Sequence, residues 1–161
     1  MTNLYVALAS RLEQTLIDLD RVVARAEMQI EKAGTTEEDS YYDAAALNLH
    51  GFYAGVERTF EDIAQTLSET LPPGANWHQN LLLQMASEIP GKRPAVIRLN
   101  SRYCLDEYRQ FRHVVRNVYT FRFRSSAVQE LVEDLRGCFD AVSTDLTNFI
   151  QFLNQLATDD N

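Results

Sequence analysis

From residue 126 to residue 157 the sequence reads SAVQELVEDLRGCFDAVSTDLTNFIQFLNQLA. Apolar residues recur here at spacings of three and four, which is the spacing of one face of an α-helix. They are Val128, Leu131, Leu135, Phe139, Val142, Leu146, Phe149, Ile150 and Leu153. Ser126, with Gln129 three residues later, predicts a capping box at the start of this helix. The segment therefore predicts a long amphipathic helix that buries one face.

The same periodicity extends over most of the chain. It predicts further long helices at residues 5–34, 42–67 and 100–121, and a short one at residues 77–89. Ser40 with Asp43 predicts a capping box for the second helix, and Asn76 predicts a cap for the short one. Proline and glycine at 72–74 and 90–91 end these two helices. Residues 92–100 contain Pro94 and a brief apolar run, which favours an ordered loop over a strand.

A chain of 161 residues without repeats or a linker predicts one domain, spanning residues 1–161. The helices predict an all-α fold, an antiparallel up-and-down bundle of four long helices and one short helix. No apolar run reaches the length of a signal peptide or of a membrane span, so we expect a cytoplasmic protein that does not enter a membrane.

The chemistry-bearing residues outside the basic segment favour structural roles. Cys104 and Cys138 lie among apolar residues with no CxxC pattern, so we expect reduced core cysteines and neither a disulfide nor a zinc site. No pair of Glu-x-x-His motifs, no HExxH and no glycine-rich phosphate loop is present, so no metal or cofactor is predicted.

Four other polar positions have an ordinary structural interpretation. Glu57 and Arg58 are expected to form ion pairs inside the bundle, and His78 is expected to cap or pack at the start of the short helix. His50 is expected to be a hydrogen-bonded helix residue. Gly51 and Gly55, four residues apart, predict a close approach by a neighbouring helix.

Charge is distributed very unevenly along this acidic chain. Residues 92–124 contain nine basic and two acidic residues, a net charge of +7. The rest of the chain therefore carries a net charge of −15, and the two sum to −8. Thirteen of the fifteen basic residues are arginine, whose planar guanidinium holds a phosphate or a carboxylate through two hydrogen bonds. Such asymmetry predicts either a local anionic partner or pairing with the molecule's own acidic side chains.

The predicted helix at residues 100–121 carries most of this charge. Arg112, Arg116 and Tyr119 fall within about 60° of one another on an ideal helix, and Arg109 adjoins them. We call Arg109, Arg112 and Arg116 the basic ridge. An apolar stripe that should pack on the bundle lies beside it, comprising Cys104, Tyr108, Phe111, Val115 and Val118.

Three segments of the chain, LHGFYAGVERTFEDIA, WHQNLLLQMASEIPGKRPAV and FRHVVRNVY, resemble the HepT-like branch of the HEPN domains, over about residues 40–135. The family mark is an arginine, four to six residues, then a histidine, often with a tyrosine two positions later. The arginine corresponds to Arg112 and the tyrosine to Tyr119. Asn117 stands where the family has histidine.

The resemblance implies a HEPN-like toxin ribonuclease of a toxin–antitoxin pair. Family members form a symmetric homodimer whose motif helices line a cleft, and they cleave RNA without metal by attack of the ribose 2′-hydroxyl on the adjacent phosphate. Arg112 would stabilise the phosphate charge, with Arg109 and Arg116 binding RNA beside it. The antitoxin of some pairs is a nucleotidyltransferase that adenylylates the motif tyrosine, which marks Tyr119 as a modification site.

Asn117 leaves two interpretations open. A carboxamide does not exchange protons near neutral pH, so in an active enzyme His113, one turn away, would take over proton transfer with Asn117 assisting. Alternatively, the chain is a catalytically silent helical binding module that keeps the dimer and the basic groove. Arg112 and Asn117 lie about 140° apart on one straight helix, so a distorted helix or a second chain must bring them together.

Overall fold

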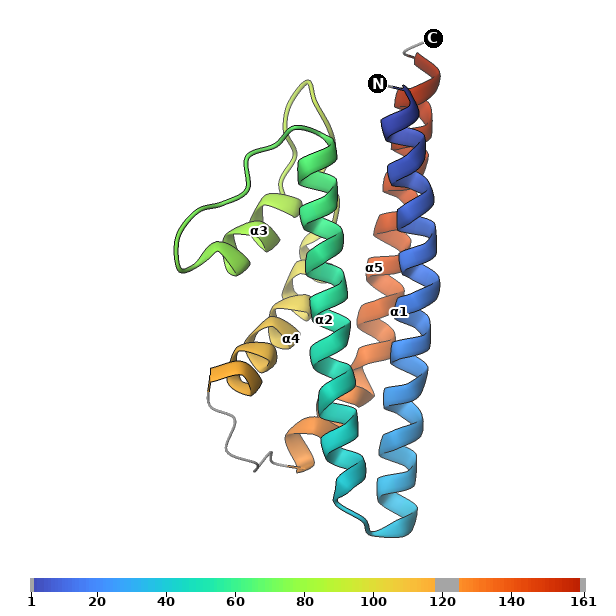
Figure 1. Ribbon diagram of the computed structural model, residues 1–161, viewed down its shortest axis with the longest axis vertical. Coiled ribbons are helices and arrows are strands. Elements are labelled where there is room, and N and C mark those ends of the chain that lie inside the picture. Colours follow the sequence, from blue (N-terminus) through green and yellow to red (C-terminus); the bar gives the residue numbers. More distant parts are fainter. Residues whose placement is uncertain (1, 118–124, 160–161) are drawn as a thin grey trace.

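The computed structural model describes residues 2–117 and 125–159, and these form five helices (Figure 1). They are α1 (Thr2–Thr36), α2 (Ser40–Thr66), α3 (Trp77–Met85), α4 (Leu99–Asn117) and α5 (Ser125–Asp159). The long helices α1, α2, α4 and α5 alternate in direction, and α3 lies beside α2 and α4 (Figure 1). The predicted all-α, up-and-down arrangement of four long helices and one short helix is confirmed.

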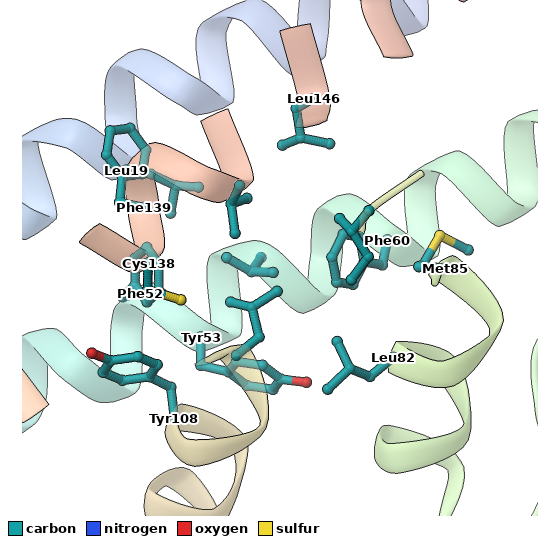
Figure 2. Close-up of a cluster of buried hydrophobic side chains, with 14 of the residues drawn as sticks. Leu19, Phe52, Tyr53, Phe60, Leu82, Met85, Tyr108, Cys138, Phe139 and Leu146 are labelled. Atoms are coloured by element: carbon teal, nitrogen blue, oxygen red, sulfur yellow. The ribbon is translucent and has the colours of Figure 1, made fainter. Parts of the chain in front are cut away.

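The predicted stripes form the core. Figure 2 shows side chains from all five helices in one cluster, including Leu19, Phe60, Met85, Tyr108 and Leu146. Each of these is at most 4% exposed. Burying one side chain of this size stabilises the fold by about 1.5–3 kcal/mol, so the periodic positions supply most of the packing energy.

Helix starts follow the sequence less closely than helix bodies. Ser40 is already the first residue of α2, and the residue before it, Asp39, makes no side-chain capping hydrogen bond. Ser126 lies inside α5, and its supposed partner Gln129 instead bonds Glu133 one turn later. Both predicted capping boxes are therefore wrong. Asn76 does occupy the position before α3, but its side chain makes no capping hydrogen bond.

The connection from α3 to α4 is an ordered loop, as predicted, and it is built around Arg93. The Arg93 side chain is fully buried and pairs with Glu69 through two hydrogen bonds, of 2.7 and 2.8 Å. Its other N–H groups donate to the carbonyl oxygens of Ser87, Pro94 and Gln84. Every guanidinium donor is thus satisfied within the protein, so this arginine fixes the loop and is not available to a ligand.

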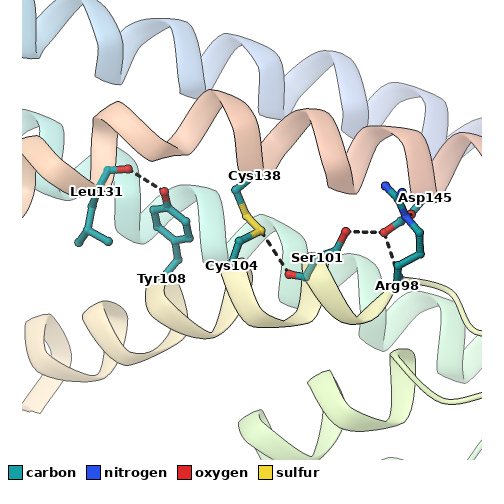
Figure 3. The surroundings of a disulfide bond; sticks show 7 residues. All are labelled: Arg98, Ser101, Cys104, Tyr108, Leu131, Cys138 and Asp145. Carbon is teal, nitrogen blue, oxygen red and sulfur yellow. Dashed lines mark hydrogen bonds and ion pairs between the residues drawn. A yellow bond between two sulfur atoms is a disulfide. The ribbon is translucent and has the colours of Figure 1, made fainter.

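Three contacts hold α4 against α5 (Figure 3). The buried carboxylate of Asp145 on α5 accepts hydrogen bonds from the backbone N–H of Arg98 and the hydroxyl of Ser101 at the start of α4. The Tyr108 hydroxyl donates to the Leu131 carbonyl at 2.6 Å. Because α4 is fixed at its beginning and its middle, the direction in which its last turns leave the bundle is also set.

The third contact overturns the prediction of reduced cysteines. Cys104 of α4 and Cys138 of α5 form a disulfide, with their Cα atoms 5.8 Å apart (Figure 3). The sequence placed Cys104 on the apolar stripe of its helix and Cys138 among apolar residues. The stripes of α4 and α5 face each other at this level, at a Cα separation that a disulfide can bridge. A sequence separation of 34 residues gives no sign of that proximity.

Within residues 2–117 and 125–159, no helix combines the length and the apolar character needed to cross a bilayer.

Candidate functional site

The candidate site lies on α4, where the sequence places the basic ridge. The Arg109 Nε atom pairs with the Asp106 carboxylate of the preceding turn at 2.6 Å. The Arg112 Nη1 atom pairs with the Glu57 carboxylate of α2, also at 2.6 Å. Two ridge arginines are therefore neutralised by the protein's own carboxylates, which is the alternative that the charge distribution left open.

Pairing extends to other members of the basic segment. Arg98 pairs with Asp145 and Arg93 with Glu69, so four of the six basic residues between 92 and 113, where the side chains are described, have an acidic partner in the fold. The arginine side chain is at most 19% exposed in three of these pairs, and Arg98 is the more exposed exception. Three of these arginines are thus placed largely out of solvent beside carboxylates of the fold.

The remaining predicted site residues are described to different extents. His113 follows Arg112 on α4 and is exposed. The backbone of Arg116 and Asn117 belongs to the end of α4, but their side chains lie outside the described part of the structure, and so does the whole of Tyr119. The structure therefore gives side-chain geometry for Arg109, Arg112 and His113 of the predicted site.

Three side chains, one from each of α2, α3 and α4, meet at the Glu57 carboxylate. Glu57 is 3% exposed and uses both carboxylate oxygens. Oε1 accepts from Arg112 Nη1 at 2.6 Å, and Oε2 lies 2.7 Å from His78 Nδ1. We call Glu57, His78 and Arg112 the Glu57 cluster. It holds a cation and an imidazole on opposite oxygens of one buried carboxylate.

Helix α2 places Glu57 in the interior. Leu49, Tyr53, Glu57 and Phe60 follow one another at spacings of four, four and three, and all four residues are buried. An ionised carboxylate in such a position is stable only when cations and hydrogen-bond donors surround it. Arg112 and His78 meet that requirement, so the packing of α3 and α4 on α2 is tied to the Glu57 charge.

The surrounding groups keep ordinary charge states at neutral pH. Burial, and then the negative charge of Glu57, raise the pKa of the Tyr53 hydroxyl far above its ordinary value, so Tyr53 stays protonated. Burial alone would raise the pKa of Asp106, but hydrogen bonds from Arg109 and Gln110 outweigh it and lower that pKa. Asp106 is therefore ionised, and Arg109 keeps its partner.

Arg112 still has donors to offer. Its side chain is 19% exposed, and Nη1 is its only guanidinium nitrogen with a hydrogen-bond partner among the described residues. The Nε atom is buried and lacks a partner there. An unsatisfied buried N–H costs about 1–3 kcal/mol, so each such group calls for an explanation, and a functional role is one of them. A guanidinium held at one corner and open at another can receive an anionic oxygen.

Sequence analysis correctly expected an ion pair for Glu57 but did not connect Glu57 and His78 with the motif arginine. One signal was available, because Glu57 interrupts an apolar face at helical spacing. A carboxylate in that position requires a cation from elsewhere in the chain. His78 offered no comparable signal, since its contact with Glu57 depends on how the loop before α3 folds back.

A family model described as "HepT-like protein" matches residues 44–153 of this chain. The match spans more than half of the sequence and covers α3 and α4 with most of α2 and most of α5. It includes Glu57, His78 and Arg112. Comparison with curated proteins gives no match, and comparison with solved structures gives none either. On the strength of the family match and the helical bundle, the chain belongs to the HepT-like family of HEPN domains.

Proposed function

We propose that this protein is a metal-independent endoribonuclease of the toxin type, in which Arg112 binds the scissile phosphate. The observation that carries the proposal is the anchored guanidinium of Arg112, on the motif helix of a HepT-like chain. Glu57 holds one corner of this group from a buried position, so the remaining donors keep a fixed direction. Donors that are oriented in advance stabilise developing charge without reorganising.

The reaction needs little else from the protein. RNA supplies its own nucleophile, the 2′-hydroxyl, so catalysis requires a cation at the phosphate and a group that moves protons near neutral pH. Arginine provides the first and, being permanently protonated, cannot provide the second. The imidazole on α4 is His113, four residues before Asn117 in the sequence, and Arg109 and Arg116 would extend the phosphate-binding surface.

Two partners complete the proposal. A homodimer in which two α4 helices face each other would bring the motif residues of both chains to one cleft and would supply charge that one chain lacks. A nucleotidyltransferase antitoxin would silence the site by modifying Tyr119. Both partners are expectations that the likeness to the HepT-like family supports.

The test is cleavage of RNA by the purified protein in excess chelator and low salt. Arg112→Ala should lower the cleavage rate by about 10²–10³-fold, the loss typical when a donor to developing negative charge is removed. Arg11→Ala is the matched control, since it removes one arginine from an exposed ion pair on α1. An intact RNA substrate with the wild-type protein, or equal rates for both variants, would reject the proposal.

A catalytically silent binding module is the second candidate. Asn117 at the histidine position favours it, and so does the pairing of Arg109 and Arg112 with internal carboxylates. The two candidates differ in their response to Asn117→His. Cleavage that appears only in this variant identifies a silent relative, whereas cleavage already present in the wild type identifies an enzyme. RNA that binds and stays intact, with affinity falling steeply as salt rises, identifies a binder.

A further inference from the structure

Proton transfer in the proposed reaction needs an imidazole on the same side of α4 as the Arg112 guanidinium. His113 is the next residue after Arg112, and successive residues of a helix point about 100° apart. His78 approaches from α3 and shares the Glu57 carboxylate with Arg112, so its ring and the guanidinium lie within the span of one carboxylate. A single phosphodiester group could reach both.

The contact with Glu57 also determines which ring nitrogen of His78 can act as a base. An ionised carboxylate oxygen 2.7 Å from Nδ1 accepts a hydrogen bond from Nδ1–H, and in the neutral ring this selects the tautomer whose lone pair is on Nε2. Within the described structure Nε2 has no hydrogen-bond partner, and the side chain is 26% exposed. Orientation of an imidazole by a buried carboxylate is the arrangement that general bases use in many hydrolases.

Packing further restricts the ring. The indole of Trp77 lies against the imidazole, with ring centroids 3.7 Å apart and an angle of 31° between the planes. Trp77 is itself half-buried against the core. His78 is therefore held on one side by an aromatic ring and at Nδ1 by a carboxylate. This is more than the capping or packing role expected from the sequence.

We infer that His78 is the proton acceptor of the ribonuclease reaction, with Glu57 as its positioning residue. The inference rests on the proposed function. It supplies the titratable base that the reaction needs, a role that the Asn117 carboxamide cannot fill. The 2′-oxygen forms a bond to phosphorus as its proton passes to Nε2, and the bond from phosphorus to the 5′-oxygen breaks as solvent gives that oxygen a proton. The products are a 2′,3′-cyclic phosphate and a 5′-hydroxyl, and Nε2 returns its proton to solvent.

The chain has three histidines, so asparagine substitutions at His50, His78 and His113 remove each imidazole in turn. His78→Asn keeps an amide that can donate a hydrogen bond to Glu57, but it loses the basic ring nitrogen. The variant therefore tests proton transfer while keeping the contact that supports folding. Its cleavage rate should fall about 10²–10⁴-fold, the usual contribution of a general base, with an unchanged melting temperature. His50→Asn is the control and should cleave like the wild type.

Rescue provides a readout that a structural role would not give. Added imidazole should restore cleavage to His78→Ala by about tenfold or more, and should not restore it to Arg112→Ala. His78→Asn cleaving within about threefold of the wild type overturns the inference and leaves the proposed function standing. A larger loss in His113→Asn than in His78→Asn assigns the proton to His113 and also overturns it. A wild-type protein without cleavage overturns both proposals.

Discussion

Glu57 and Arg112 are 55 residues apart in the sequence, yet their side chains lie 2.6 Å apart in the structure. The carboxylate is 5% exposed and the guanidinium 19%, so solvent screens the pair weakly. This contact joins α2, the helix with the buried carboxylate, to α4, the helix with the family motif. It therefore concerns the stability of the bundle as well as its chemistry.

Glu57→Ala should lower the free energy of unfolding by about 3–5 kcal/mol, because it leaves a largely buried guanidinium without its partner. Removing both partners should cost clearly less than the sum of the single losses. Urea unfolding of the two single variants and the double variant measures this coupling. Asp62→Ala is the control on the same helix: its partner Arg11 is 49% exposed, so the loss should be under about 1 kcal/mol. Equal losses at Glu57 and Asp62 would contradict the burial of the Glu57 pair.

Glu69 should make the fold sensitive to acid. Burial acts to raise the pKa of Glu69, but hydrogen bonds from Arg93 and Gln84 outweigh it, and the pKa is lowered below its ordinary value of 4.5. A lowered native pKa stabilises the fold above the ordinary value, and this contribution disappears as the pH falls through the native pKa.

Urea midpoints measured between pH 7 and pH 3 should therefore fall for the wild type below about pH 4.5. Glu69→Gln should be less stable at pH 7 and should lose less on acidification. Glu88→Gln, which alters an exposed carboxylate near the same loop, controls for the loss of one charge. A Glu69→Gln curve parallel to that of the wild type would show that Glu69 does not contribute to the acid response.

The disulfide between α4 and α5 should stabilise the protein in the absence of reductant. A cross-link across 34 residues lowers the entropy of the unfolded chain, which corresponds to about 4 kcal/mol. Reduction, or the pair of substitutions Cys104→Ser and Cys138→Ser, should lower the urea midpoint accordingly. Two titratable thiols in the denatured, unreduced protein would refute the bond directly.

Gly51 and Gly55 lie one turn apart on α2 but differ in their surroundings. A Cβ atom at Gly51 would meet no heavy atom within 4 Å, whereas one at Gly55 would lie 3.0 Å from the Leu19 Cδ2 atom of α1. Alanine favours a helix over glycine by about 0.5–1 kcal/mol, so Gly51→Ala should raise the melting temperature.

Gly55→Ala gains the same helix propensity but crowds Leu19, which is only 4% exposed and has little room to move. It should be less stable than Gly51→Ala by about 1 kcal/mol or more. The close helix approach predicted for both glycines is thus confined to Gly55. Equal stabilisation by the two substitutions would mean that α1 shifts without cost.

Periodicity was a sound guide wherever a helix buries one continuous stripe. The spacing from Val128 to Leu153 predicts α5 because each of these positions repeats the same packing requirement. Helix starts were poorly predicted. A capping box needs its serine in the position just before the helix, whereas Ser40 and Ser126 already lie within α2 and α5.

The candidate site was predictable only where it lies on one helix. Arg109, Arg112 and His113 follow from the motif and from the angular spacing of α4. Their partners do not, because pairing across helices depends on which faces meet after folding. The same limit explains the disulfide: two cysteines in correctly predicted helices gave no indication that those helices oppose each other at that level.

The three residues of the Glu57 cluster come from α2, α3 and α4, and none comes from α1 or α5. These two helices are the longest, at 35 residues each, and they pack against each other and against α2 (Figure 1). The disulfide and the Asp145 hydrogen bonds nevertheless join α5 to α4, so the helix that carries Arg112 is cross-linked to the rest of the bundle. A substitution in the Glu57 cluster therefore disturbs contacts among three helices at once, and each variant of the site calls for a folding measurement beside its activity measurement.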